Sequence, residues 1–210
     1  MKRPLFIARQ SGNPRGALGA IVAEVMAHET ISVNVHAIRR LGLAPSNHVV
    51  DVGTGHGRAL QHIASQVPEG RVVGVDHSPL MCRKAARFNS KLVDSGQVRI
   101  ECADTHALPF AEETFDAALA VHTVYFWQPI EPHLSELARV LRRGGRLVLA
   151  FLADGNPATR QFPSAVYRFR STAQVEASLR TCGFGSITAS YEAEGDGDVV
   201  FVVATREQER

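Results

Sequence analysis

The 210-residue sequence has few cysteines, no long hydrophobic run and almost no excess of one charge. Its three cysteines, Cys82, Cys102 and Cys182, are isolated from one another and odd in number. This argues against a disulfide framework and against a structural zinc site, so we expect a reducing compartment and no metal. No eighteen apolar residues run together, and the basic N-terminal segment lacks the apolar core of a signal peptide. These absences predict a soluble, cytoplasmic protein without a membrane span.

The charge is nearly balanced, with 23 basic residues (Lys and Arg) against 21 acidic ones (Asp and Glu). Such a balance gives no reason to expect a nucleic acid or an anionic membrane as partner. The basic run 139–146 lies at the end of an expected helix, where arginine interacts favourably with the helix dipole. We therefore expect a small-molecule partner. The oligomeric state is not indicated by any pattern in the sequence.

Short β-rich runs alternate with helix-length segments from Val49 onward. This alternation is typical of an α/β protein with a parallel sheet and right-handed crossover helices. The expected strands are 48–53, 71–76, 97–104, 115–121, 145–151, 186–191 and 199–205. The expected helices are 58–66, 79–94, 131–142 and 173–182. The last two strands are joined by the polar segment "EAEGDGD" without a helix, which predicts an antiparallel hairpin at the end of the sheet.

Two more helices are expected ahead of the sheet. Apolar residues recur at helical spacing over 18–26 and again at Ile31, Val35 and Ile38, so both helices should pack on the sheet. The glycine-rich segment before them, 9–19, is a candidate for closing over a ligand. We expect one domain over 1–210, in which a helical lid (1–45) covers an α/β core (46–210).

Three glycines, Gly53, Gly55 and Gly57, follow the first expected strand in the stretch "VVDVGTGHGR". In an open α/β sheet, ligands bind beyond the carboxyl ends of the strands, and glycine lets the backbone approach them closely. A dinucleotide would place its pyrophosphate at this turn, but the third glycine comes one position too early for that motif. Moreover, Asp51 would repel a pyrophosphate and would attract an ammonium group, such as that of S-adenosylmethionine.

Acidic residues also end the next two strands. Asp76 closes the second strand, where a carboxylate can accept hydrogen bonds from a ribose diol. Asp104 closes the third, where its oxygen can accept from an exocyclic adenine amine. The ribose contact suits NAD and an adenosyl ligand equally. Together with Asp51, however, the three acids at successive strand ends indicate a nucleoside-binding edge.

The sequence resembles the class I S-adenosylmethionine-dependent methyltransferases, in particular the bacterial group with type 11-like domains. The resemblance is carried by "VVDVGTGHG", "VVGVDHSP", "ECADTHALPF", "FDAALAVHTVYFW" and "ELARVLRRGGRLVLAF", which occur in the family's order over about half of the chain. It implies a Rossmann-like, doubly wound sheet of seven strands in the order 3-2-1-4-5-7-6, with the seventh antiparallel. It also implies S-adenosylmethionine as cofactor and S-adenosylhomocysteine as product. The cofactor-binding residues that it implies are Asp51, Gly53, Gly55, Gly57, Asp76, His77, Met81, Asp104, Thr105 and His122.

Methyl transfer requires an acceptor lone pair aligned with the methyl group, and a base only if the acceptor must lose a proton. His122 follows the fourth strand and is the best candidate for that base, with Tyr125 beside it as a second catalytic candidate. Tyr125, Phe126 and Trp127 are candidates for an aromatic wall of the acceptor pocket. His106 and His133 carry little signal, and we expect His133 at the surface. The atom that accepts the methyl group is not indicated.

Other interpretations remain open. An NAD-dependent oxidoreductase would share the ribose-binding acid, and a non-catalytic S-adenosylmethionine-binding module would share the whole cofactor loop. Cysteines that hold a metalloid, as in arsenite methyltransferases, are disfavoured because Cys82 and Cys102 fall on different elements that do not obviously converge with Cys182. The "NPPY" signature of amino-methylating enzymes is absent after the fourth strand.

Overall fold

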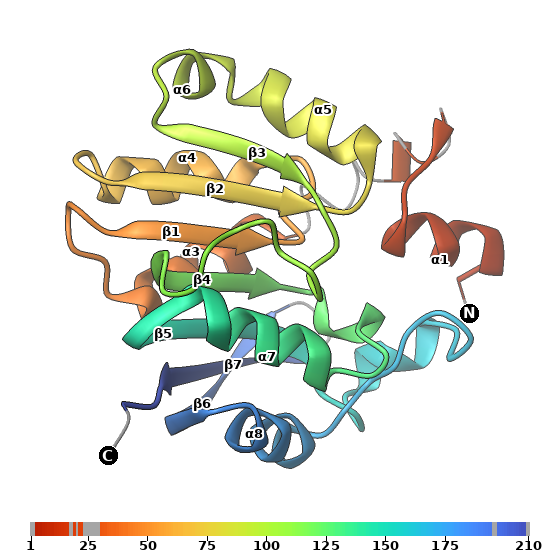
Figure 1. Cartoon of the computed structure of the whole chain (residues 1–210). Helices are drawn as coiled ribbons and strands as arrows, with labels where there is room; N and C mark the ends of the chain where they lie inside the picture. Colours follow the sequence, from red (N-terminus) through yellow and green to blue (C-terminus); the bar gives the residue numbers. More distant parts are fainter. Residues whose placement is uncertain (1–2, 17–18, 20, 23–29, 195–196, 209–210) are drawn as a thin grey trace.

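A seven-stranded sheet forms the centre of the molecule. The computed structural model describes residues 3–208 apart from 17–18, 20, 23–29 and 195–196. The strand order is β3-β2-β1-β4-β5-β7-β6 (Figure 1), and β7 runs antiparallel to both of its neighbours while the other pairs are parallel. The strands are β1 (His48–Val52), β2 (Arg71–Asp76), β3 (Val98–Cys102), β4 (Phe115–Val121), β5 (Leu141–Leu152), β6 (Phe184–Glu194) and β7 (Gly197–Arg206). The predicted α/β class, strand order and terminal hairpin are confirmed.

Helices cover both faces of the sheet (Figure 1). Successive strand residues point to opposite faces, so Val49 packs in the core beneath α3 and α4 while Val50 packs in the core beneath α7 and α8. The helices are α1 (Leu5–Gly12), α3 (Ile31–Leu41), α4 (Arg58–Gln66), α5 (Pro79–Phe88), α6 (Ser90–Asp94), α7 (Glu131–Val140) and α8 (Thr172–Thr181). Two short 3-10 helices, η1 (Val124–Phe126) and η2 (Pro157–Gln161), lie in loops. Among the described residues, no helix is long and apolar enough to span a membrane.

Two predicted helix boundaries were wrong for local reasons. The helix expected over 79–94 is divided at Asn89, whose side-chain amide donates to the carbonyls of Gly57 and Ala85 and turns the chain between α5 and α6. The helix expected over 131–142 ends at Val140 because Leu141 is already extended and begins β5. Residues 142–146 are arginines and glycines, so the apolar pattern that indicates a strand begins only after them and does not show where the strand starts.

The N-terminal segment differs more from the sequence-based expectation. Helix α1 was not predicted, whereas most of the helix expected over 18–26 lies outside the described residues. The helix expected around Ile31 is present as α3, but its buried face is different. Val33 and Ala37 are buried beside Ile38, while Ile31 is 42% exposed. Helix α3 packs against α4, β4 and β5, and the positions of these elements determine which of its side chains are buried.

Candidate functional site

A cavity of about 680 Å³ opens at the carboxyl ends of the parallel strands, where the loops after β1, β2, β3 and β4 meet. The N-terminal segment around α1 supplies another wall through residues 9 and 11–14. Of the residues predicted from the sequence, those that line the cavity are Asp51, Gly53, Gly55, Asp76, His77, Met81, Asp104, Thr105 and His122. Gly57 and Tyr125 do not line it. The edge of the sheet that the sequence indicated therefore holds a real pocket.

The three glycines of the loop after β1 have different roles, although all three have positive φ. A Cβ at Gly53 would overlap the methyl group of Thr123, whereas a Cβ at Gly55 would stand in open space. Gly57 is the N-cap of α4, and a Cβ there would press on Ala85 and Asn89 of the neighbouring helix and its cap. Gly55 thus leaves room for a ligand, while Gly57 serves the packing of α4 against α5.

Asp51 lies near the end of β1 inside the protein, with only 4% of its surface exposed. The hydroxyl of Thr54 donates a 2.7 Å hydrogen bond to its Oδ2. Burial raises the pKa of Asp51 to about 7, and the nearby negative charge of Asp76 acts in the same direction. From the sequence alone, a fixed negative charge was expected at this position. The structure corrects that view, because burial leaves Asp51 only partly ionised near neutral pH and a cation beside it would favour the charged form.

Asp76 connects the glycine loop to the end of β2. Its Oδ2 accepts the N–H of Gly55 at 3.0 Å, and its Oδ1 accepts the N–H of Ser78 at 2.8 Å. Burial raises the pKa of Asp76, although these two hydrogen bonds oppose the shift. Each carboxylate oxygen keeps a second lone pair, so Asp76 can also accept from a ligand. Met81 lies buried on α5 beside this loop, and His77 is half exposed, with Nδ1 3.9 Å from Asp76 Oδ1.

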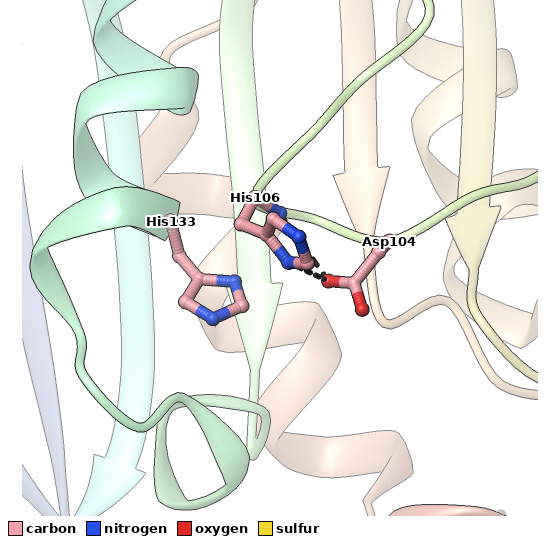
Figure 2. A group of neighbouring side chains, drawn as sticks. All are labelled: Asp104, His106 and His133. Atoms are coloured by element: carbon pink, nitrogen blue, oxygen red, sulfur yellow. Dashed lines mark hydrogen bonds and ion pairs between the residues drawn. The ribbon is translucent and has the colours of Figure 1, made fainter.

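A cluster of one acid and two histidines lies after β3 (Figure 2). Asp104 Oδ1 lies 2.7 Å from His106 Nδ1. Partial burial acts to raise the pKa of Asp104, but hydrogen bonds from His106 keep it below its usual value. His133 comes from the start of α7, and its ring stacks on Trp127 with centroids 5.0 Å apart. Burial lowers the pKa of His133 to about 4, so this imidazole is neutral at physiological pH.

His106 and His133 both line the cavity, which the sequence analysis did not foresee. His133 is half buried against Trp127 and is not the surface residue that was expected. No sequence signal could have found this pair, because the fold brings α7 to the loop after β3 across 27 residues of chain. Of the three residues expected to form an aromatic wall, Phe126 and Trp127 line the cavity and Tyr125 does not.

His122 directly follows β4 in a left-handed backbone conformation, with φ +55°, which is strained for a residue that has a side chain. Its N–H donates to the carbonyl of Ala150 at 2.8 Å. Its Nδ1 lies 2.9 Å from the hydroxyl of Tyr125, which in turn accepts the N–H of Leu152 at 2.6 Å. Tyr125 is buried, and burial raises its pKa far above the usual value. Tyr125 therefore lies behind His122 and contacts it rather than the cavity.

The family model described as "Methyltransferase domain" matches residues 50–149. Over 152 residues the chain is 31% identical to an O-methyltransferase of Pyrenophora dematioidea, with 71% of this chain and 55% of that protein aligned. It is 38% identical over 123 residues to a ubiquinone/menaquinone biosynthesis C-methyltransferase of Syntrophotalea carbinolica, with 58% and 51% aligned. The matched part thus spans about half the length of these relatives.

The whole fold also resembles a solved structure. A chain of the complex between the Haloferax volcanii Trm112 methyltransferase activator and a methyltransferase superimposes with a TM-score of 0.78. The two chains are 20% identical, and the superposition covers 99% of this chain and 100% of that one. At this level of identity the match supports the fold alone.

Proposed function

We propose that this chain, which belongs to the class I S-adenosylmethionine-dependent methyltransferases, binds S-adenosylmethionine in the cavity and methylates a small-molecule acceptor. The observation that carries the proposal is the buried carboxylate of Asp51 beside the open backbone of Gly55. A positive group must approach this carboxylate, and the missing side chain leaves room for it. The cofactor's α-ammonium group fits both requirements.

The methionine part of the cofactor would be held by Asp51 and by the backbone of Gly53 and Gly55. The cost of ionising Asp51 inside the protein is offset when the ammonium group lies next to it, because two opposite charges attract strongly where water is excluded. Thr54 supports this arrangement by donating its hydroxyl to the same carboxylate. The loop is thus prepared for a ligand that is cationic at this end.

The nucleoside part would extend along the ends of β2 and β3. Asp76 would accept from the ribose diol with the lone pairs left over by Gly55 and Ser78. Met81 and His77 would flank the adenine ring. Asp104 would accept a hydrogen bond from its exocyclic amine, and Thr105 would form a hydrogen bond with the same edge of the ring. The order of these residues along the sheet edge follows the order of the strands, β1, then β2, then β3.

S-adenosylmethionine supplies an electrophilic methyl group on a sulfonium, which the lone pair of an acceptor takes by in-line displacement. The protein's part is to align the acceptor and to exclude water. Phe126, Trp127 and Val166 line the cavity with apolar surface suited to this. Residue Gly12 of α1 lies against the Phe126 ring so closely that an added Cβ would be 2.9 Å from it.

The described part of residues 1–45 would act as a lid over this acceptor region. The hydroxyl of Ser78 donates to the carbonyl of Pro14 at 2.9 Å, and the guanidinium of Arg3 lies 4.6 Å from the centre of the Phe162 ring. The N-terminal segment therefore bridges loops on both sides of the cavity. Because this cover includes the polar residues Arg9 and Asn13, the acceptor pocket has polar as well as apolar walls.

Tyr125 would act as a positioning residue for His122. The Tyr125 oxygen accepts the Leu152 N–H, and the hydrogen of this buried hydroxyl needs an acceptor of its own. We assign that acceptor to His122 Nδ1, which places the proton of neutral His122 on Nε2. In this tautomer His122 offers a hydrogen-bond donor to the acceptor substrate. In this tautomer Nε2 cannot accept a proton. To serve as the base proposed from the sequence, His122 must first carry its proton on Nδ1 instead of Nε2.

Replacement of Tyr125 by phenylalanine should lower the rate of methyl transfer roughly tenfold and leave cofactor affinity unchanged. The reason is that His122 loses the partner that sets its tautomer, while the cofactor contacts remain. Nitrogen NMR of the His122 ring reports the tautomer directly and should show the proton on Nε2 in the parent chain and a mixture in the variant. A parent His122 with its proton on Nδ1 would contradict the assignment and restore the base role.

Replacement of Asp76 by alanine should weaken S-adenosylhomocysteine binding by roughly 1.5 to 3 kcal/mol, through loss of charge-assisted hydrogen bonds to the ribose. The Gly55 and Ser78 N–H groups also lose their acceptor, so a lower but still cooperative melting temperature is expected. Isothermal calorimetry measures the affinity. An affinity equal to that of the parent chain would remove Asp76 from the cofactor site.

The proposed activity is tested by methyl transfer from labelled S-adenosylmethionine to a panel of phenols, amines, thiols and quinone-like lipids. Transfer to one class identifies the acceptor chemistry. Thermal melting separates the alternatives, because S-adenosylhomocysteine should stabilise the fold and NADH should not. Stabilisation by NADH alone would overturn the proposal in favour of an oxidoreductase. Stabilisation by S-adenosylhomocysteine without transfer to any acceptor on the panel would favour a non-catalytic binding module.

A further inference from the structure

We propose that Asp104, His106 and His133 form a binding site for a zinc-like divalent transition-metal ion at the edge of the cavity. One ligand atom from each residue lies within 4.8 Å of the other two. Figure 2 shows His106 between the carboxylate of Asp104 and the ring of His133, so the three groups converge on one region. No metal was expected from the sequence, since its three isolated cysteines argue against a structural zinc site and His106 and His133 carry little signal.

The set of ligand types favours zinc over calcium or magnesium. Two imidazoles and one carboxylate are the ligands that zinc and neighbouring transition metals bind well, whereas calcium and magnesium require oxygen ligands. Zinc sites with three protein ligands keep a fourth position for water. Among the described residues, Asp104, His106 and His133 bring one carboxylate and two imidazoles together, which is such a set of three protein ligands.

Only small movements are needed to reach ligand geometry. Zinc binds histidine nitrogen and carboxylate oxygen at about 2.0–2.2 Å, so tetrahedral ligand atoms are about 3.3 to 3.6 Å apart. Asp104 Oδ1 and His106 Nδ1 are now 2.7 Å apart and would separate slightly, and the ligand atom of His133 lies within 4.8 Å of the ligand atoms of both. The side chains of Asp104 and His106 are about half exposed, 52% and 53%, so they can turn without disturbing the core.

His133 is already oriented as metal-bound histidines usually are. Such histidines commonly donate the N–H of the ring nitrogen that does not bind the metal to a nearby oxygen. Nδ1 of His133 lies 2.5 Å from the Thr105 hydroxyl, and its ring is fixed by stacking on Trp127. We assign the proton of His133 to Nδ1, which then donates to the Thr105 hydroxyl and leaves Nε2 to bind the metal. The hydroxyl and the indole therefore provide the supporting contacts that a metal site needs.

Metal binding would compete with the cofactor. Asp104 is also the residue proposed to contact the adenine amine. All three ligand residues line the cavity, so a zinc ion and its bound water would occupy space beside Asp104 that the adenine needs. This consequence rests on the proposed function, whereas the metal site itself does not. Zinc would then act as a reversible inhibitor of cofactor binding.

Zinc titration of the tag-free, reduced full chain by isothermal calorimetry tests the site. We expect one zinc ion per chain, with affinity weakened at least about tenfold by His106→Ala and by His133→Ala. His62→Ala is the matched control, because His62 is an exposed histidine on α4 away from the cluster, and it should leave the affinity unchanged. Cobalt in place of zinc should give visible absorption bands of low-coordinate cobalt that are lost in the same two variants.

Three results would overturn the site: no zinc binding, binding unchanged in both histidine variants, or binding lost in Cys102→Ser, which removes the exposed thiol. The competition is tested separately with S-adenosylhomocysteine. Zinc should weaken its binding to the parent chain and not to His106→Ala, and an affinity that zinc does not change would overturn the competition. If S-adenosylhomocysteine does not bind even without zinc, the proposed function fails, while the zinc titration still tests the metal site.

Discussion

Replacement of Asp51 by asparagine is expected to weaken S-adenosylmethionine binding roughly 100-fold, which corresponds to about 3 kcal/mol. The variant keeps the shape of the side chain and the hydrogen bond from Thr54, but it removes the charge that would face the cofactor's ammonium group. Isothermal calorimetry with S-adenosylhomocysteine, which carries the same ammonium group, measures the loss. Asp94→Asn is the control, since Asp94 is an exposed carboxylate at the end of α6. An affinity equal to that of the parent would show that Asp51 does not bind the amino end.

The same substitution should stabilise the ligand-free chain at alkaline pH. The pKa of Asp51 is about 7 in the folded chain and 3.8 for an unperturbed group, so between these values the folded state binds more protons than the unfolded state. Stability therefore falls as pH rises through this window, by at most roughly 4 kcal/mol. The Asp51→Asn variant cannot ionise at this position, so its stability does not fall in this way as pH rises. Urea denaturation should find the variant more stable than the parent at pH 8, with a smaller difference at pH 5.

Cofactor affinity of the parent chain should also depend on pH because of Asp51. Below its pKa of about 7 the carboxyl of the ligand-free chain is mostly protonated, and binding of the ammonium group must first release that proton. We expect affinity to rise by up to about tenfold per pH unit between pH 5.5 and 7 and then to level off. Asp51→Asn should remove this dependence. A flat profile in the parent chain would contradict the pKa and the contact together.

Replacement of Gly53 by alanine is expected to destabilise the fold by about 2 to 5 kcal/mol, the largest stability effect predicted here. The residue has φ +73°, and an added Cβ would overlap the methyl group of Thr123. The double variant Gly53→Ala/Thr123→Ser removes that methyl group and should recover part of the loss. Chemical denaturation measures both. Equal stability of the single and double variants would show that the clash is relieved in another way.

Gly55→Ala is the matched comparison. Its φ of +54° carries a similar backbone cost, about 1 to 2 kcal/mol, but its Cβ would stand in open space at the cavity. We therefore expect a smaller loss of stability than for Gly53→Ala and a large loss of cofactor affinity, because the new methyl group occupies the place of the ligand. Parent-like affinity in Gly55→Ala would exclude close approach of the cofactor to this residue.

The sequence by itself was sufficient to predict the α/β class and the terminal hairpin. It also placed the acids Asp51, Asp76 and Asp104 at one edge of the sheet. These features depend on local patterns, since the alternation of strands and helices sets the chain direction, and parallel strands all end at the same edge. The family resemblance completed the order of the strands.

Only the tertiary structure decided how deeply those residues are buried and which side chains contact them. It buried Asp51 and raised its pKa, placed Tyr125 behind His122, gave Gly57 a packing role and brought His133 to Asp104 and His106. The physical reason is that burial and side-chain neighbours come from elements far apart in the chain. A residue's position along a strand or loop carries no information about the helix that will be packed against it.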